Sequence, residues 1–257
     1  NLSGSLTVYA QSAESSISFL NNDSETRQLN LYANKDVTLS KNLTTTGFVV
    51  VDADLNNEGT GDFTIDSGMT LDTTNNTFNM VANDIHLPGT INTGTSNITM
   101  TNSDGGFSKL GNVAGTDGLT LHKDDFTRIL GTNFTFNSNP LGGNIEIDGL
   151  AFLDLAGIVG EKFIFANNNE ATVTFTGSDV ELADATIQAH NNITVDANLT
   201  TTGVLNIDAD RDNDGTGDFI VTATHAIDTQ DGDMNIIAND VDYQGTITAG
   251  TGAITQS

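Results

Sequence analysis

The densest group of possible metal ligands in this sequence is a run of alternating aspartates. Residues 208–218 read DADRDNDGTGD, and from Asp210 they follow the pattern D-x-D-x-D-G-x-x-D. In calcium loops of the EF-hand type, oxygen ligands at positions 1, 3 and 5 converge on the ion, glycine at position 6 permits the turn, and a backbone carbonyl contributes at position 7. The pattern therefore predicts a Ca²⁺ site with these ligands: Asp210, Asp212, Asp214, Thr216 and Asp218.

A related stretch lies earlier in the chain, where each replacement keeps an oxygen ligand. The corresponding candidates are Asp54, Asn56, Glu58, Thr60 and Asp62. Position 12, which usually carries a bidentate glutamate, is Ile65 in this stretch and Val221 in the later one. Asp, Asn and Gly also favour ordinary turns between strands. A solvated acidic turn is therefore the alternative interpretation of both stretches.

The charge balance excludes several classes of function. The chain has 34 acidic and 8 basic residues and a formal net charge of −26. Such a chain lacks the basic patch that nucleic acids and anionic membranes require, so we expect neither as a partner. No apolar run approaches the length of about 18 residues that spans a bilayer, and there is no cysteine.

Catalytic chemistry is not indicated by the spacing of the remaining titratable residues. Acidic pairs such as Asp124 and Asp125 could serve a polysaccharide-degrading enzyme, but so acidic a chain offers many such pairs. The histidines share no spacing that suggests a metal site or a catalytic triad; they are His86, His122, His190 and His225. We therefore expect the protein not to be an enzyme.

The elements that must position these residues belong to a long internal repeat. NLTTTG at residues 42–47 recurs at 198–203, an offset of 156 that continues without a gap to Ser257. We divide the chain into a first long repeat, 1–156, and a partial second repeat, 157–257, continuous with the first. The sequence starts without methionine, and we expect it to be part of a longer protein.

A shorter period lies inside the long one. Leu31, Val51, Leu71 and Ile91 recur at a constant offset of 20, which suggests eight units of this size in each long repeat. Apolar residues alternate with polar ones over short stretches, as in strands with one buried face. Units this small cannot bury an apolar face alone, but stacked units can. We therefore predict an all-β, right-handed parallel β-helix, a solenoid with rungs of about 20 residues, and consider an array of β-sandwiches less consistent with the period.

Two further structural expectations follow from this pattern. About 13 rungs at the spacing of paired strands would give a rod of roughly 60 Å with open strand edges at its ends. The one segment in which a short helix is compatible with the sequence is LAFLDLA, residues 150–156.

Two adjacent phrases resemble a known family. They are TIQAHNNITV at residues 186–195 and NLTTTG at 198–203. They resemble the rungs of large bacterial β-strand-repeat surface proteins of the filamentous-haemagglutinin (adhesin) type. This resemblance implies an exported, adhesive or filament-forming protein with a right-handed β-helix.

Together these observations predict a structural segment of an extracellular fibre, stalk or adhesin on a prokaryotic cell surface, stabilised by Ca²⁺. Its expected partners are copies of itself, end to end or side by side, and cell-surface glycans. The alternative is a calcium-dependent carbohydrate-binding module. With no Trp and three Tyr, the chain is poorly supplied with aromatic rings on which a sugar could stack.

Overall fold

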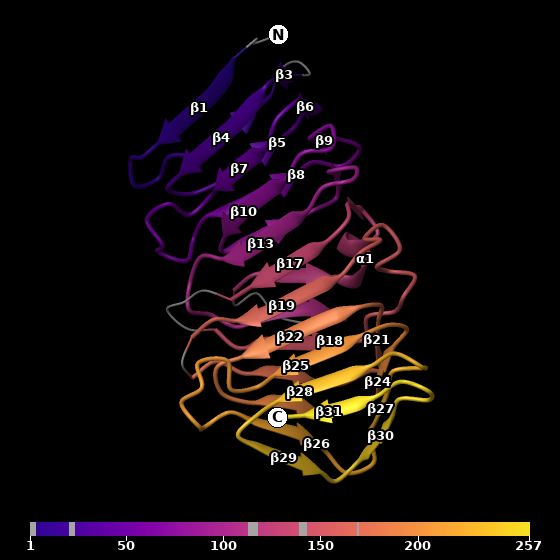
Figure 1. Cartoon of the computed structure of the whole chain (residues 1–257). Helices are drawn as coiled ribbons and strands as arrows, with labels where there is room; N and C mark the ends of the chain where they lie inside the picture. The colour runs from indigo at the N-terminus through magenta and orange to yellow at the C-terminus, as the bar shows by residue number, and fades with distance from the viewer. Residues whose placement is uncertain (1–3, 21–23, 113–117, 139–142, 169) are drawn as a thin grey trace.

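The protein is almost entirely β-structure. The computed structural model describes residues 4–20, 24–112, 118–138, 143–168 and 170–257, and these contain 31 strands and one helix, α1 (Lys123–Phe126). The strands stack above one another from the N-terminal to the C-terminal end of an elongated molecule (Figure 1).

The largest sheet has 11 strands and runs the length of the molecule. In spatial order its strands are β1 (Ser5–Ala10), β4 (Gln28–Ala33), β7 (Val49–Asp52), β10 (Phe78–Ala82), β13 (Ile98–Asn102), β17 (Phe134–Asn137), β19 (Lys162–Ala166), β22 (Ala185–Ala189), β25 (Leu205–Asp208), β28 (Met234–Ile237) and β31 (Ile254–Gln256).

Two smaller sheets accompany the N-terminal part of this large sheet. One has four strands, β2 (Ile17–Phe19), β5 (Val37–Leu39), β8 (Asp62–Ile65) and β11 (Asp84–His86). The other has five, β3 (Ser24–Thr26), β6 (Leu43–Thr45), β9 (Thr70–Asp72), β12 (Thr90–Asn92) and β16 (Ile129–Leu130).

Two more sheets accompany its C-terminal part. One has seven strands, β14 (Ser108–Gly111), β15 (Thr120–His122), β18 (Ile145–Asp148), β20 (Val173–Phe175), β23 (Ile193–Val195), β26 (Asp218–Val221) and β29 (Asp240–Tyr243). The other has four, β21 (Val180–Leu182), β24 (Leu199–Thr201), β27 (Ala226–Asp228) and β30 (Thr246–Thr248).

The chain leaves the 11-stranded sheet after each of its strands, passes through other sheets and returns to pair in parallel with the strand it left. Thus β4 pairs with β7, β7 with β10, and β10 with β13, with β5, β6, β8, β9, β11 and β12 between them in sequence. We call the residues between two register partners in this sheet one circuit of the chain.

The interior is built from the inward side chains of these circuits. Burial alternates along the strands, as in β4, where Leu29, Leu31 and Ala33 are fully buried and the residues between them are partly exposed. Register pairing places Leu31 beside Val51 and Val51 beside Met80, so like side chains stack along the molecule. This continuous apolar column replaces the separate core that so short a unit could not form.

The prediction of a constant step between register partners is wrong. Leu31 and Val51 are register partners at the predicted offset of 20, but Val51 pairs with Met80 at an offset of 29, and Met100 pairs with Phe136 at an offset of 36. Leu71, which the period placed in the column of Val51, instead pairs with Leu43 in another sheet. Six circuits, rather than eight, lead from Leu31 to its repeat equivalent Ile187.

Insertions between the strands explain the unequal circuits. The circuit from Val51 to Met80 contains the candidate loop at 53–61 between β7 and β8, and the circuit from Met100 to Phe136 contains β14, β15 and α1. Residues that leave the sheets are not constrained by strand register, so a circuit can lengthen without disturbing its neighbours. The helix also lies elsewhere than expected, at Lys123–Phe126, while residues 152–157 form turns.

Local structure follows the long repeat closely. The first residues of β7 and β25 are separated by the repeat offset of 156, as are those of β8 and β26, and of β10 and β28. Both candidate loops therefore connect equivalent strands and leave the 11-stranded sheet at equivalent points.

Candidate functional site

The second candidate loop, residues 209–217, connects β25 to β26 and is closed by a tight approach of backbone to backbone. A side chain at Gly217 would place its Cβ 1.7 Å from the carbonyl oxygen of Ala209 and 2.3 Å from that of Asn191. Only glycine fits there. Asn213 and Gly215 adopt positive φ angles of 54° and 83°, which Asn and Gly tolerate best.

Asp210 organises this loop from within. Its side chain is buried, and its Oδ1 and Oδ2 accept hydrogen bonds from the backbone N–H groups of Asp214 (3.0 Å) and Gly215 (3.1 Å). The carboxylate therefore fixes the turn whether or not a cation is bound.

The three alternating aspartates are brought together. One carboxylate oxygen from each of Asp210, Asp212 and Asp214 lies within 4.8 Å of the other two. Among the described residues this is the single group of three or more acidic, His or Cys side chains gathered so closely. Three converging carboxylate oxygens are suited to a hard divalent cation such as Ca²⁺.

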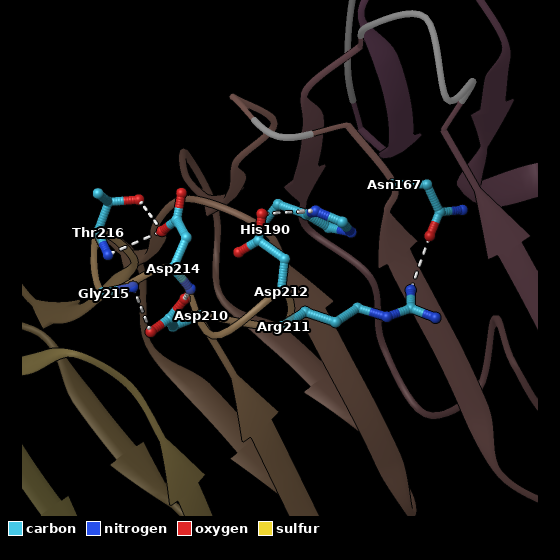
Figure 2. A network of polar contacts seen from close by, with 8 residues as sticks. All are labelled: Asn167, His190, Asp210, Arg211, Asp212, Asp214, Gly215 and Thr216. Atoms are coloured by element: carbon cyan, nitrogen blue, oxygen red, sulfur yellow. Dashed lines mark hydrogen bonds and ion pairs between the residues drawn. The ribbon is translucent and has the colours of Figure 1, made fainter.

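Neighbouring side chains hold the flanks of this cluster (Figure 2). Asp214 Oδ1 accepts hydrogen bonds from the N–H of Thr216 (3.0 Å) and from its hydroxyl (2.5 Å). The Nδ1 atom of His190 lies 3.3 Å from Asp212 Oδ2, and Arg211 donates to Asn167 Oδ1 at 2.7 Å, so its guanidinium points away from the cluster.

Asp218, the predicted ligand at position 9, is not part of the cluster. It begins β26, where its N–H donates to Asn192 Oδ1 at 2.9 Å and its own Oδ1 accepts from Asn239 at 3.3 Å. Asp62 occupies the same place in the first loop, accepting from Asn83 at 3.3 Å. Burial raises the pKa of Asp62, and the nearby carboxylates of Asp36 and Asp54 add to this effect.

The first loop has the same backbone turn but a different acidic group. Asp54 is fully buried and accepts hydrogen bonds from the N–H groups of Glu58 (3.2 Å) and Gly59 (2.9 Å). The hydroxyl of Ser103, which lies two circuits further along the chain, donates to Asp54 Oδ2 at 2.6 Å. Asn56 Oδ1 is buried and has no hydrogen-bond partner among the described residues.

The two loops thus differ in what their first aspartate does. Asp54 is used by two backbone donors and by Ser103. Asp210 has the two backbone donors, and Asp212 and Asp214 lie close beside it. Glu58 and Thr60 are exposed and do not gather with Asp54 into a comparable group among the described residues. The second loop is therefore the better candidate for a cation site.

A second polar cleft was missed in the sequence because its residues are distant in the chain. A cavity of about 410 Å³ beside α1 is lined by Asp84, Ile85, His86, Leu87, Pro88, His122, Asp124, Asp125 and Arg128. Two of the four histidines, which share no informative spacing, thus line the same cavity.

Polar contacts between circuits and within the segment around α1 build this cleft. Asp84 Oδ1 accepts a hydrogen bond from the N–H of Thr120 at 2.9 Å. This bond joins β11 to β15 in the next circuit, and a side-chain oxygen takes the place of the backbone carbonyl that would pair two strands of one sheet. Asp125 Oδ2 accepts from the N–H of His122 at 3.0 Å, and Arg128 lies 3.5 Å from Asp125 Oδ1.

Burial raises the pKa of both Asp84 and Asp125. The backbone N–H groups that donate to these carboxylates lower both pKa values, and so does the nearby imidazole of His122. The positive charge of Arg128 also lowers the pKa of Asp125. The signal that could have identified the cleft is the offset of 36 shared by His86 and His122 and by the register partners Met100 and Phe136. This offset can be interpreted only when the lengths of the circuits are known from the structure.

Comparisons with known proteins do not assign the chain to a family. No helix among the described residues has the length and apolar character needed to cross a bilayer. A scan against protein-family models finds no match, and searches of curated proteins and of solved structures find none either.

Proposed function

We propose that this chain is a structural segment of an extracellular fibre, stalk or adhesin on a prokaryotic cell surface, folded as a right-handed parallel β-helix. The observation that carries the proposal is the 11-stranded sheet, which is parallel throughout and continuous from β1 to β31. A structure in which each circuit contacts only its neighbours can lengthen by adding circuits, as a fibre requires.

The handedness follows from a general rule. Each circuit is a crossover between parallel strands of one sheet, and such crossovers are right-handed in about 98% of known cases. The strand positions that recur at the offset of 156 agree with a unit made to be added in series. The resemblance to filamentous-haemagglutinin-type surface proteins supports the extracellular location.

Ca²⁺ has a defined role in this proposal. Asp210, Asp212 and Asp214 gather negative charge at one loop of a chain that carries a net charge of −26. A divalent cation there would offset the repulsion between these carboxylates and fix the loop between β25 and β26. The ion would act as a structural stabiliser and perform no chemistry.

Small-angle X-ray scattering tests the shape that the function requires. With 11 stacked strands at about 4.8 Å per spacing, we expect a rod with a length of about 50 Å. This is shorter than the roughly 60 Å expected for rungs of about 20 residues each. The inserted residues make single circuits longer but add no strands to the stack. A compact, near-spherical particle would contradict the proposal.

The location needs a separate experiment. Antibodies raised against this chain should label the surface of intact cells of the source organism, along fibres visible by immunogold electron microscopy. Labelling only after cell lysis would overturn the assignment to the cell surface and leave the rod fold unaffected.

A further inference from the structure

The outward face of the 11-stranded sheet differs in charge from the rest of the molecule. Within the described strands of this sheet, the charged residues are Asp52, Asp208 and Lys162, and Lys162 points into the interior. By contrast, the seven-stranded sheet carries many outward acids: Glu146, Asp148, Asp218, Asp240 and Asp242. We call the outward side chains of the 11-stranded sheet the neutral face; its central column includes Asn30, Asn79, Thr99, Thr135, Thr186 and Asn206.

Polar groups on the neutral face bond to one another along the molecule. Asn206 donates to Thr186 Oγ1 at 3.1 Å, Asn235 donates to Asn206 Oδ1 at 2.8 Å, and Thr255 donates to Asn235 Oδ1 at 2.5 Å. At the other end, Asn30 donates to Thr7 Oγ1 at 3.1 Å. Groups that already have partners within the chain cost less to remove from water than unpaired ones.

Apolar side chains lie between these polar ones. The rings of Tyr9 and Tyr32 stack with centroids 5.0 Å apart, and those of Phe163 and Phe165 lie 5.9 Å apart. Ile237 is 44% exposed. The guanidinium of Arg211 covers one margin, 4.9 Å from the centre of the Phe165 ring. The face thus combines aromatic, aliphatic and internally bonded polar groups, a composition suited to a protein–protein contact.

We propose that two copies of this chain associate side by side through their neutral faces. The inference rests on the proposed fibre function and names the surface through which fibres would bundle. Chains with a net charge of −26 repel one another. Contact through the neutral face brings together few carboxylates, those of Asp52, Asp208 and Glu161, which accepts a hydrogen bond from Thr186. Contact through the seven-stranded sheet would instead oppose two larger sets of acids.

The area of the face is sufficient for a stable pair. Eleven strands of about four residues each span about 50 Å by about 14 Å, roughly 700 Å² on each copy. The total of about 1,400 Å² falls within the range of specific protein–protein interfaces.

Sedimentation velocity over a wide concentration range tests the association. We expect a reversible dimer that strengthens with added salt, because salt screens the repulsion between the charges that surround the face. Asn79→Glu/Thr135→Glu places two carboxylates at the centre of the face, where the register neighbours are uncharged. It should weaken dimerisation about tenfold or more.

The matched control is Thr38→Glu/Thr194→Glu, which adds the same charge at outward positions of β5 and β23, also beside uncharged neighbours. It should dimerise nearly as well as the wild type, and melting temperatures should show that both variants are folded. Equal weakening by both variants would overturn the assigned surface.

A rod-shaped protein that stays monomeric at all concentrations would overturn the association and leave the proposed fibre function intact. A monomer that binds an insoluble neutral polysaccharide through Asn79 and Thr135 would assign the face to a glycan and likewise overturn it. Scattering from a globular particle would instead contradict the fibre proposal itself.

Discussion

Asp54 and Asp210 each use one carboxylate to fix the turn of their loop. Each accepts two backbone N–H groups from its own loop, which is the role that short acidic side chains have in many turns. The calcium-like pattern is therefore not sufficient evidence for a metal. The distinguishing feature is the position of Asp212 and Asp214 beside Asp210.

Single glycines close both loops, and they lead to a prediction. A Cβ at Gly61 would lie 1.7 Å from the carbonyl oxygen of Ala53, as it would at Gly217 from that of Ala209. Backbone atoms cannot yield as a flexible side chain would, so we expect Gly61→Ala and Gly217→Ala each to destabilise the fold by about 2–3 kcal/mol.

Thermal unfolding checks this expectation. Gly4→Ala is the control, because nothing lies within 4 Å of a Cβ placed there. The prediction is wrong if Gly217→Ala melts at the temperature of the control variant.

At the scale of elements, the two loops connect equivalent strands but meet different surroundings. Ser103 reaches Asp54 from the circuit that contains β13, whereas His190 reaches Asp212 from the circuit that contains β22. The repeated sequence thus gives the two loops the same backbone shape, but the side chains around them differ. We expect only the second loop to respond strongly to calcium.

Melting temperatures with Ca²⁺ and with a chelator test this difference. A cation that binds only the folded form raises the melting temperature by mass action, and without the position-12 carboxylate we expect a dissociation constant on the order of 10⁻⁴ M. Asp212→Asn/Asp214→Asn should abolish the calcium increment. Glu58→Gln/Asp62→Asn, which neutralises the same number of carboxylates at the first loop, should retain it.

Two results would contradict this expectation. Equal melting temperatures of the wild type with and without Ca²⁺, at matched ionic strength, would leave both loops as plain acidic turns. An increment lost in the first-loop variant would place the ion at Asp54 instead.

At the scale of the whole molecule, partly buried carboxylates link stability to pH. Five aspartates have pKa values that are raised in the folded state, mainly by burial. They are Asp52, Asp62, Asp84, Asp125 and Asp208. A carboxyl group with a raised pKa binds its proton more tightly when folded. Its contribution is complete below the unfolded pKa and is lost as the pH rises through the folded value.

We therefore expect mild acidification, from neutral pH toward about pH 5, to raise the melting temperature. Reduced repulsion in a chain with a net charge of −26 acts in the same direction. Asp84→Asn keeps the Oδ1 acceptor for Ile85 and Thr120 and should remove part of this increment. Asp124→Asn, at an exposed carboxylate of the same cleft, is the control. A melting temperature that falls steadily from pH 7 to pH 5 would refute the expectation.

The sequence alone determined the class of secondary structure, the long repeat and the location of the acidic loops. Alternation of residues such as Leu29 and Leu31 is a local property of the chain, because successive side chains of a strand face opposite sides. The offset of 156 between Asn42 and Asn198 and the pattern after Asp210 can likewise be read without any knowledge of contacts.

Only the tertiary structure decided which residues pair. The step from Leu31 to Val51 was correct, but the next step to Leu71 was not, because the loop at 53–61 adds residues that no strand register constrains. For the same reason, the proximity of His86 and His122 to one cleft and the neutral character of one sheet face were invisible in the sequence. A periodic sequence pattern identifies the residues that lie in the sheets. It does not give the lengths of the insertions between strands, because those lengths depend on where the chain returns to pair with the neighbouring circuit.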